Sequence, residues 1–239
     1  MKIKLTFLLL LLSLCLCAQI NYQKGDTLFV WANSGLNLRE TPNENGKILT
    51  TIPFGELVEI ISETENEMFD VEIIKSKKIN NKWTPNYSIS GYLIKVNYKN
   101  ITGYIYSGFL SKLEPIYNIQ TLYSLNEIFE KEHGIAKRFE WGNNERINNE
   151  IIFNNGFVYY ERAGNAWFQT TYMLSNVRFE EGILIVYNFI ENMNKSQNGI
   201  WFIEKTKDSF LTFTENSNMY NASIRQMNNI FILTIDGSN

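Results

Sequence analysis

The chain has few of the side chains on which most hydrolases depend. Among its 239 residues are two cysteines, Cys15 and Cys17, and a single histidine, His133. A zinc amidase or metallopeptidase typically needs at least two histidines beside a carboxylate. A Ser-His-Asp triad could use only His133, and the sequence contains neither a Gly-x-Ser-x-Gly elbow nor a glycine-rich phosphate loop. We therefore expect no enzyme activity, no cofactor and no metal site.

Both cysteines lie in an N-terminal segment that has the form of a secretory signal peptide. Lys2 and Lys4 precede an apolar run at residues 5–16, and polar chain begins at Gln19. A positive start and a short apolar run are typical of such signals, whereas a membrane-spanning helix needs about 20 apolar residues. We expect residues 1–18 to be removed on export; a retained N-terminal anchor is the alternative. Each cysteine follows a leucine where a lipoprotein requires a small residue, which disfavours lipidation.

Removal of this segment changes the chemistry of the mature chain. Without residues 1–18 it has no disulfide and no thiolate for a Cys-His peptidase. It keeps 20 basic and 25 acidic side chains, so the formal charge changes from −3 to −5. Nucleic-acid binders carry clustered positive charge, and an acidic chain has no electrostatic attraction to anionic lipid. We expect no nucleic-acid partner and, after signal removal, no integral membrane segment.

A pair of catalytic carboxylates is the enzymatic arrangement that composition leaves open. A glycosidase needs only two Asp or Glu side chains about 5–9.5 Å apart. Glu180, Glu181 and Glu191 are the candidates in this sequence. Because Glu180-Glu181-Gly182 is typical of a solvated turn, a carboxylate-pair hydrolase is only the third hypothesis.

The hydrophobic pattern has a period of two along most of the chain, which predicts an all-β fold. In the first half, strands are predicted at residues 27–31, 47–52, 57–62, 69–74 and 92–98. Ser124 and Glu127 form a capping-box pattern at the start of a short apolar-sided segment, and Gly134 is a natural helix stop. We expect one short linker helix within residues 114–135, between the two halves of the chain.

Strand patterns resume in residues 136–239, which we expect to form an antiparallel meander, either a sheet or a barrel. The best hairpin signal is Asn155-Gly156 between two apolar runs. Further strands are predicted at residues 167–174, 177–179, 183–190, 200–205, 210–214 and 230–235. Tyr159 and Tyr160 are adjacent, so one of them must point away from the core. The sequence contains no convincing internal repeat.

Residues 25–113 contain two blocks of motifs that occur in a familiar order. The first block has Gly-Leu-Asn-Leu-Arg at residues 35–39 and a Pro-Phe-Gly turn at 53–55. The second has the strand at residues 91–96, with its Lys-Val pair, and Gly-Tyr-Ile at 103–105. In this order the motifs resemble the bacterial SH3 (SH3b) domain family. The resemblance does not extend to the rest of the chain.

The resemblance implies an N-terminal SH3-like small barrel that binds a peptide or a glycan stem. Leu36 and Leu38 are two residues apart, so both should face the barrel interior. Gly35 and Gly55 suit turns that need a positive φ. These residues are expected to be structural and not to contact a ligand.

The chain departs from the SH3b pattern in a long insert at residues 63–90. Loops of that length in a compact barrel are usually functional or mobile. Trp83 and Tyr87 of the insert either bind a ligand or cap the barrel. Tyr104 and Tyr106 share one face of the last long strand of the domain, and the residue between them is the natural core residue. We therefore expect these four aromatic side chains to form the ligand-binding site.

Two functional hypotheses follow for the exported chain, whose location would be the periplasm or the cell surface of a bacterium. The first is a non-enzymatic binding module of the cell envelope, whose SH3b domain contacts peptidoglycan or an envelope protein. The alternative is a lipocalin-like carrier, in which the strands of residues 136–239 close around a small apolar ligand.

Overall fold

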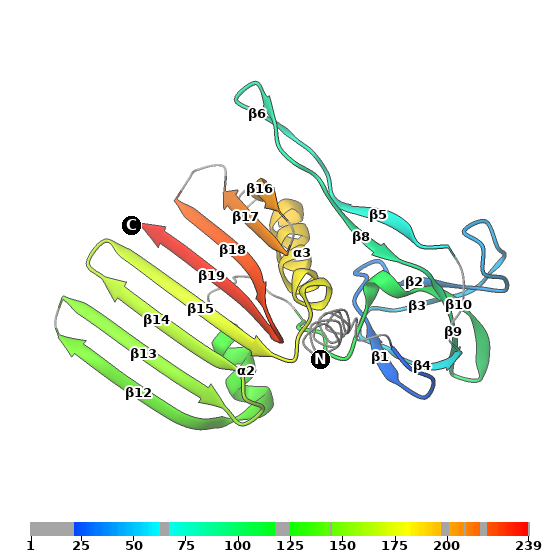
Figure 1. Cartoon of the computed structure of the whole chain (residues 1–239), viewed down its shortest axis with the longest axis horizontal. Coiled ribbons are helices and arrows are strands. Elements are labelled where there is room, and N and C mark those ends of the chain that lie inside the picture. Colours follow the sequence, from blue (N-terminus) through cyan, green and yellow to red (C-terminus); the bar gives the residue numbers. More distant parts are fainter. Residues whose placement is uncertain are drawn as a thin grey trace, which may run out of the picture.

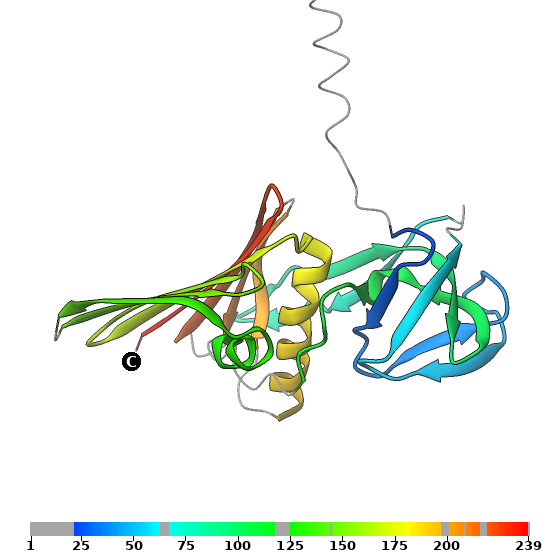
Figure 2. The same ribbon diagram turned by 90° about the horizontal axis from the view of Figure 1, so that it is seen from below.

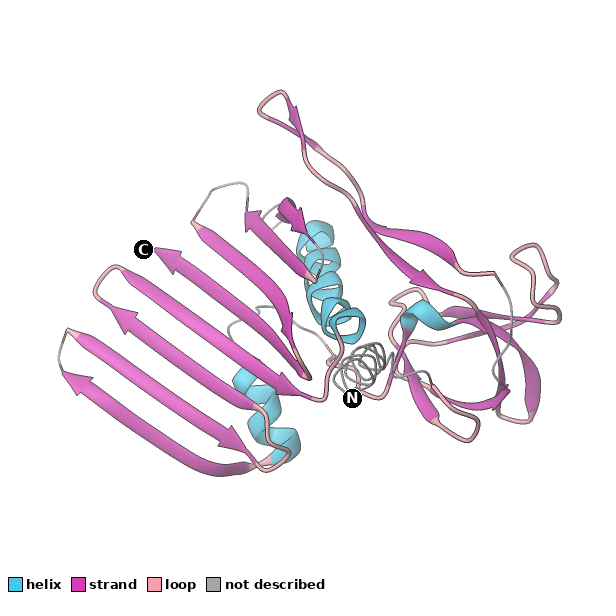
Figure 3. Ribbon diagram, in the orientation of Figure 1, coloured by secondary structure: helices cyan, strands magenta, loops and turns pink. Residues whose placement is uncertain are grey.

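The computed structural model describes residues 22–62, 67–117, 125–143, 145–196, 201–207, 209–215 and 219–238. The expected signal segment and the capping residue Ser124 lie outside these ranges. The described chain contains two regions of antiparallel sheet with a long helix between them (Figures 1 and 3). The predicted all-β class is confirmed.

The first region is a seven-stranded antiparallel sheet with the order β11-β1-β4-β9-β10-β2-β3. Its strands are β1 (Thr27–Val30), β2 (Leu36–Arg39), β3 (Ile48–Ile52), β4 (Leu57–Ser62), β9 (Leu93–Tyr98), β10 (Ile101–Tyr106) and β11 (Leu110–Ser111), and a 3-10 turn, η2 (Ser107–Phe109), precedes the last. Leu36 and Leu38 are buried while Asn37 is half exposed, so the predicted register is confirmed. Gly35 and Gly55 have φ angles of 79° and 83°, as predicted for their turns.

A long hairpin, here called the finger, projects from this sheet (Figure 1). It begins with the paired strands β5 (Phe69–Ile74) and β8 (Tyr87–Gly91) and continues as β6 (Lys78–Ile79) and β7 (Lys82–Trp83). Asn80 and Asn81 at its tip have φ angles of 48° and 63°, which a two-residue type I′ turn requires. The described part of the insert therefore forms a protruding hairpin.

The second region is an eight-stranded antiparallel sheet accompanied by two helices. The helices are α2 (Leu125–His133) and α3 (Phe179–Ser196). The strands are β12 (Ile135–Asn143), β13 (Arg146–Phe153), β14 (Val158–Gly164), β15 (Trp167–Ser175), β16 (Trp201–Lys207), β17 (Phe210–Glu215), β18 (Tyr220–Met227) and β19 (Ile230–Ser238). The sheet order is β12-β13-β14-β15-β19-β18-β17-β16, with β12 and β16 at its edges. Of the two expected forms, the described strands make an open sheet.

The C-terminal region contains one arrangement twice, a helix followed by a four-stranded meander. α2 precedes β12 to β15, α3 precedes β16 to β19, and the two meanders join through their last strands. These two nine-residue strands pair centre to centre, with Thr171 opposite Thr234 and their hydroxyl oxygens 3.3 Å apart. Both meanders can form from different residues, provided that buried and exposed positions alternate along the strands of each. A comparison of residue identities therefore does not reveal this repeat.

The prediction of strands at residues 177–179 and 183–190 is wrong, because α3 takes up almost all of that stretch. Ile183, Leu184 and Ile185 are fully buried in succession, as is the valine that follows them. A helix that is buried over most of its surface can contain a continuous apolar run, and such a run resembles that of a buried strand.

α3 is enclosed because it lies between the two sheet regions (Figure 2). Toward the C-terminal sheet, the ring of Phe179 lies 6.2 Å from that of Phe231. Toward the seven-stranded sheet, the ring of Tyr187 lies 6.2 Å from that of Phe109. Within the described ranges, neither helix is long and apolar enough to cross a membrane.

α2 occupies the predicted helical segment and ends where predicted. Gly134 has a φ of 69°, and its backbone N–H donates to the Glu130 carbonyl. The expectation that this helix would link the two halves is wrong, since it packs on the C-terminal sheet. The ring of Phe129 lies 5.8 Å from that of Phe153 and 6.1 Å from that of Tyr172. The packing contacts between the two halves are made by α3 instead.

We predict that Gly182→Ala destabilises the protein, although alanine normally favours a helix interior by about 1 kcal/mol over glycine. A Cβ at Gly182 would lie 2.3 Å from ring carbons of Phe231. Overpacking of this kind costs about 1–3 kcal/mol of unfolding free energy. Urea denaturation of Gly182→Ala, Phe231→Leu and the double variant should show that the shorter side chain recovers part of the loss. Strictly additive losses would contradict this close contact.

Candidate binding surfaces

Tyr106 is not on the surface of the SH3-like sheet, contrary to expectation. Its side chain is 7% exposed, and its hydroxyl donates to the Ile89 carbonyl at 2.6 Å. Its ring lies 4.7 Å from that of Phe69, and burial raises the pKa of the Tyr106 hydroxyl. The hairpin of β5 and β8 covers this face of β10, so Tyr106 supports the base of the finger.

Tyr104 remains half exposed on the body of the sheet. It pairs with Arg39 on β2 and with Lys95 on β9. The Lys95 ammonium lies 6.0 Å from the centroid of the Tyr104 ring, at the outer limit of a cation–π contact. Tyr104 is thus an accessible aromatic side chain with cations on both neighbouring strands.

The two aromatic residues of the insert have different surroundings. Trp83, near the tip of the finger, is 72% exposed and pairs with Lys78 on β6. Tyr87, at the base, lies 6.4 Å from the ring of Phe179 on α3. Burial, with a contribution from Glu180, raises the pKa of Tyr87 to about 12. Trp83 therefore faces solvent, whereas Tyr87 contacts the helix.

The finger is basic as well as aromatic. Ser76 Oγ donates to the Thr84 carbonyl at 2.5 Å, and the backbone N–H of Lys77 donates to Thr84 Oγ1 at 2.8 Å, so the strands are tied together below the tip. The lysines of the finger are Lys75, Lys77, Lys78 and Lys82. These contacts hold the Trp83 indole on a defined hairpin that carries a local positive charge.

The structure does not bring the four predicted residues into one groove. Trp83 lies far out on the finger and Tyr104 lies in the body of the sheet (Figure 1). Tyr87 and Tyr106 are engaged in contacts within the protein. The accessible members of the predicted set therefore form two separate points on the SH3-like region.

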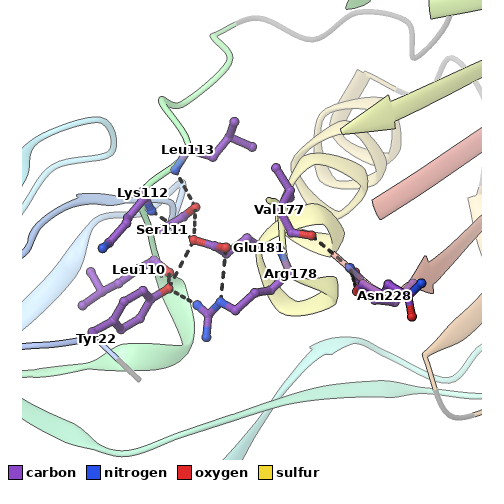
Figure 4. A network of polar contacts seen from close by, with 10 residues as sticks. Tyr22, Leu110, Ser111, Lys112, Leu113, Val177, Arg178, Glu181 and Asn228 are labelled. Carbon is purple, nitrogen blue, oxygen red and sulfur yellow. Dashed lines mark hydrogen bonds and ion pairs between the residues drawn. The ribbon is translucent and has the colours of Figure 1, made fainter. Parts of the chain in front are cut away.

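A buried polar network joins α3 to the seven-stranded sheet (Figure 4). Glu181 is 6% exposed, and its Oε1 accepts hydrogen bonds from Ser111 Oγ at 2.9 Å and from the Lys112 backbone N–H at 3.0 Å. Its Oε2 accepts a hydrogen bond from Arg178 Nε at 3.2 Å. Both carboxylate oxygens are thus satisfied by partners on the two sides of the junction.

Tyr22 completes this network from the N-terminal side. Its hydroxyl donates to the Leu110 carbonyl at 2.5 Å and accepts a hydrogen bond from Arg178. The Arg178 guanidinium also lies 4.5 Å from the centroid of the Tyr22 ring. Burial and then the Glu181 charge raise the pKa of Tyr22, so the phenol stays neutral and keeps its proton for Leu110.

Two further contacts extend the junction along α3. Asn33 Nδ2 donates to Glu191 Oε2, and Asn188 Nδ2 lies 3.5 Å from the Trp31 carbonyl. Glu181 and Glu191, two of the candidates for a carboxylate pair, both hold the helix against the sheet. Their partners give each carboxylate a structural role.

Comparison with known families identifies the first region. Residues 34–111 match the family model of the bacterial SH3 domain, and the C-terminal half matches no family. The resemblance predicted over residues 25–113 is confirmed. Searches of the curated proteins and of the solved structures give no match. The chain therefore carries a bacterial SH3 domain, which is a binding domain and not a catalytic one, and this domain contains the finger and Tyr104.

The junction is difficult to predict from the sequence. The spacing of Arg178 and Glu181 is that of an i, i+3 ion pair on a helix, which was the available signal that this stretch is not a solvated turn. Nothing in the sequence connects either residue to Tyr22, which lies 156 positions from Arg178. This partnership depends on the packing of the two regions.

We predict that Glu181→Ala lowers the free energy of unfolding by about 3 kcal/mol, since it leaves a largely buried cation without its partner. Tyr22→Phe removes only the hydroxyl and should cost about 1 kcal/mol. Urea denaturation followed by tryptophan fluorescence measures both losses. If the junction couples the two regions, Glu181→Ala should also separate the unfolding into two transitions. A single transition at the wild-type midpoint would contradict the structural role of Glu181.

Proposed function

We propose that this protein is an exported, non-enzymatic binding protein of the bacterial cell envelope, and that its SH3 domain contacts peptidoglycan. An envelope protein is the second class of partner for the same surface. The observation that carries the proposal is the exposed Trp83 on a lysine-rich finger that belongs to the SH3 domain. The signal-like residues 1–18 support a location in the periplasm or at the cell surface.

The chemistry of the finger suits a peptidoglycan strand. A tryptophan offers a large apolar face with one polar tip, which suits contact with a sugar ring in a wet interface. Peptide stems of peptidoglycan end in carboxylates, and the four lysines of the finger would attract these groups. The whole chain is acidic, with a formal charge of −3, so the local positive charge would also orient the finger toward an anionic surface.

Tyr104 provides a second contact on the same domain. It is half exposed and is flanked by Arg39 and Lys95, so it combines an aromatic face with positive charge in the same way as Trp83. Tyr87 and Tyr106 would act indirectly, by holding the base of the finger. Binding at two separated points would favour an extended ligand over a small molecule.

The lipocalin-like alternative has less support. A carrier of that kind needs strands that close around a ligand. The eight C-terminal strands described here form an open sheet whose edges are β12 and β16. Residues from α2 and α3 fill one of its faces, so a ligand would have to bind on the other face.

We predict that Trp83→Ala and Tyr104→Ala each reduce retention of the purified chain on peptidoglycan sacculi, by about 1–3 kcal/mol in binding free energy. Co-sedimentation with purified sacculi at several salt concentrations measures this. Retention should also fall as salt is raised, because the lysines of the finger are exposed to screening.

Ile101→Ala is the matched control, because Ile101 is an exposed apolar residue on the same strand as Tyr104. Its retention should equal that of the wild type. Equal retention of the Trp83→Ala/Tyr104→Ala double variant, with an unchanged circular dichroism spectrum, would exclude these residues from the site. Capture of an envelope protein by the finger, without retention on sacculi, would select the second class of partner.

A further inference from the structure

The C-terminal sheet has one face that neither helix covers, here called the helix-free face. Tyr159 and Tyr172 point to the other face, where the Phe129 ring of α2 lies 6.1 Å from that of Tyr172. Tyr160 therefore points to the helix-free face, as expected of one member of this adjacent pair. An antiparallel sheet with one packed face normally has a polar second face. The helix-free face differs from that rule at one end, where it carries exposed aromatic side chains.

A row of polar side chains crosses the helix-free face from strand to strand. Directly paired residues of an antiparallel sheet lie on the same face, so their side chains are neighbours. From β13 to β17 in sheet order, the row consists of Asn148, Arg162, Gln169, Asp236, Asn221 and Thr214. At the usual separation of strands, it is about 24 Å long. The row presents both donors and acceptors along one line.

Hydrogen bonds between neighbouring members of the row order Thr214, Asn221 and Asp236. Thr214 Oγ1 donates to Asn221 Oδ1 at 3.1 Å, which leaves the amide nitrogen of Asn221 for Asp236. Burial raises the pKa of Asp236, and the hydrogen bond from Asn221 opposes this effect. The carboxylate is thus partly removed from water although it lies on the open face.

Aromatic side chains gather at one end of the row. Trp141 is 48% exposed and stacks on Tyr160, with ring centroids 6.0 Å apart and an interplanar angle of 29°. Trp167 is 39% exposed, and the Arg162 guanidinium lies 5.8 Å from its ring. A Cβ at Gly164 would lie 2.6 Å from the indole nitrogen of Trp167, so the indole lies across this glycine. The two tryptophans are therefore held in place while remaining accessible.

A hollow of about 340 Å³ lies between the aromatic end and the middle of the row. Its lining includes Arg162, Trp167, Gln169, Asn221, Asp236 and Ser238. It thus combines an indole face, two amides, a hydroxyl and one charge of each sign. A pocket with an apolar wall and a few convergent polar groups is the usual form of a ligand site.

We propose that the helix-free face is a binding site for a neutral oligosaccharide that lies along the polar row. A sugar ring would stack on Trp167 in the hollow, and its hydroxyls would exchange hydrogen bonds with Gln169, Asp236 and Asn221. The Trp141–Tyr160 stack would hold a further sugar unit near β12. The proposal does not depend on the SH3 domain, since the described residues that form this face all belong to the C-terminal sheet.

The lining of the hollow favours a saccharide over other polymers. Its charged side chains are one arginine and one aspartate, which matches a neutral ligand better than a polyanion such as a nucleic acid. An extended peptide would instead be expected to pair with the backbone of an edge strand. A polyhydroxylated ring needs both donors and acceptors beside an apolar face, and the polar row and the two tryptophans provide these.

Titration of the purified full chain with hexasaccharides of β-linked N-acetylglucosamine and of β-linked glucose tests the proposal. Calorimetry and tryptophan fluorescence would report binding of at least one of them. Trp167→Ala and Asp236→Ala should each weaken this binding by about tenfold or more. Gly164→Ala should weaken it as well, because the added methyl group displaces the Trp167 indole without removing any contacting side chain.

Ile147→Ala is the matched control, because Ile147 is 60% exposed and its neighbour Asn148 belongs to the row, so its side chain points to the opposite face. Its affinity should equal that of the wild type. The proposal is overturned if neither hexasaccharide binds, or if the Trp167 and Asp236 variants bind as well as the control. It is also overturned if a single-stranded oligonucleotide or a peptide binds this face and the sugars do not. Retention on sacculi through Trp83 and Tyr104 is a separate measurement, so either proposal can fail alone.

Discussion

α3 is buried between two sheets, and this burial determines how the two regions of the chain pack together (Figure 2). Most of its side chains between residues 179 and 190 are buried, so the helix must be covered on more than one side. The C-terminal sheet covers one side through Phe231, and the SH3 domain covers another through Phe109. Neither region alone would remove the whole helix from water, which is why the two regions form one interface.

This interface also determines which surfaces remain available for binding. Tyr87 contacts Phe179 of α3, and Tyr106 is buried beneath the hairpin of β5 and β8. The four aromatic residues expected to form one binding site on the SH3 domain therefore do not share one accessible face. What remains accessible on the domain is Tyr104 and the tip of the finger, where Trp83 lies among lysines. The insert thus moves the accessible aromatic surface away from the body of the domain.

The polar contacts at the junction give the interface its specificity. Apolar packing alone would permit α3 to slide along its axis, because one aliphatic side chain resembles the next. The Glu181 carboxylate is satisfied only when Ser111, Lys112 and Arg178 all reach it. A buried carboxylate without these partners would be costly, so the network favours one register of the helix over its neighbours. The two proposed binding surfaces therefore have a defined position relative to each other.

The sequence determined much of the SH3 domain. The spacing of Leu36 and Leu38 defined the buried face of β2, because side chains alternate along a strand with a fixed period. In the C-terminal region, the turn at Asn155-Gly156 located the hairpin of β13 and β14, because this turn signal is local. The all-β class followed from the period of two in the hydrophobic pattern, but this pattern did not predict β12 or β18 and placed strands where α3 lies. The resemblance to bacterial SH3 domains came from motifs whose order is independent of the insert.

Tertiary structure decided the identity of α3, the burial of Tyr106 and the composition of the helix-free face. An apolar run of that length fits a buried helix as well as a buried strand, and only the presence of sheets on both sides makes the helix the better solution. Tyr106 is next to a core residue on β10, so the strand pattern predicts that its side chain is exposed. In the structure, the hairpin of β5 and β8 covers it. The row from Asn148 to Thr214 consists of residues far apart in the chain. Strand order and register bring them together, and neither is encoded by any local pattern in the sequence.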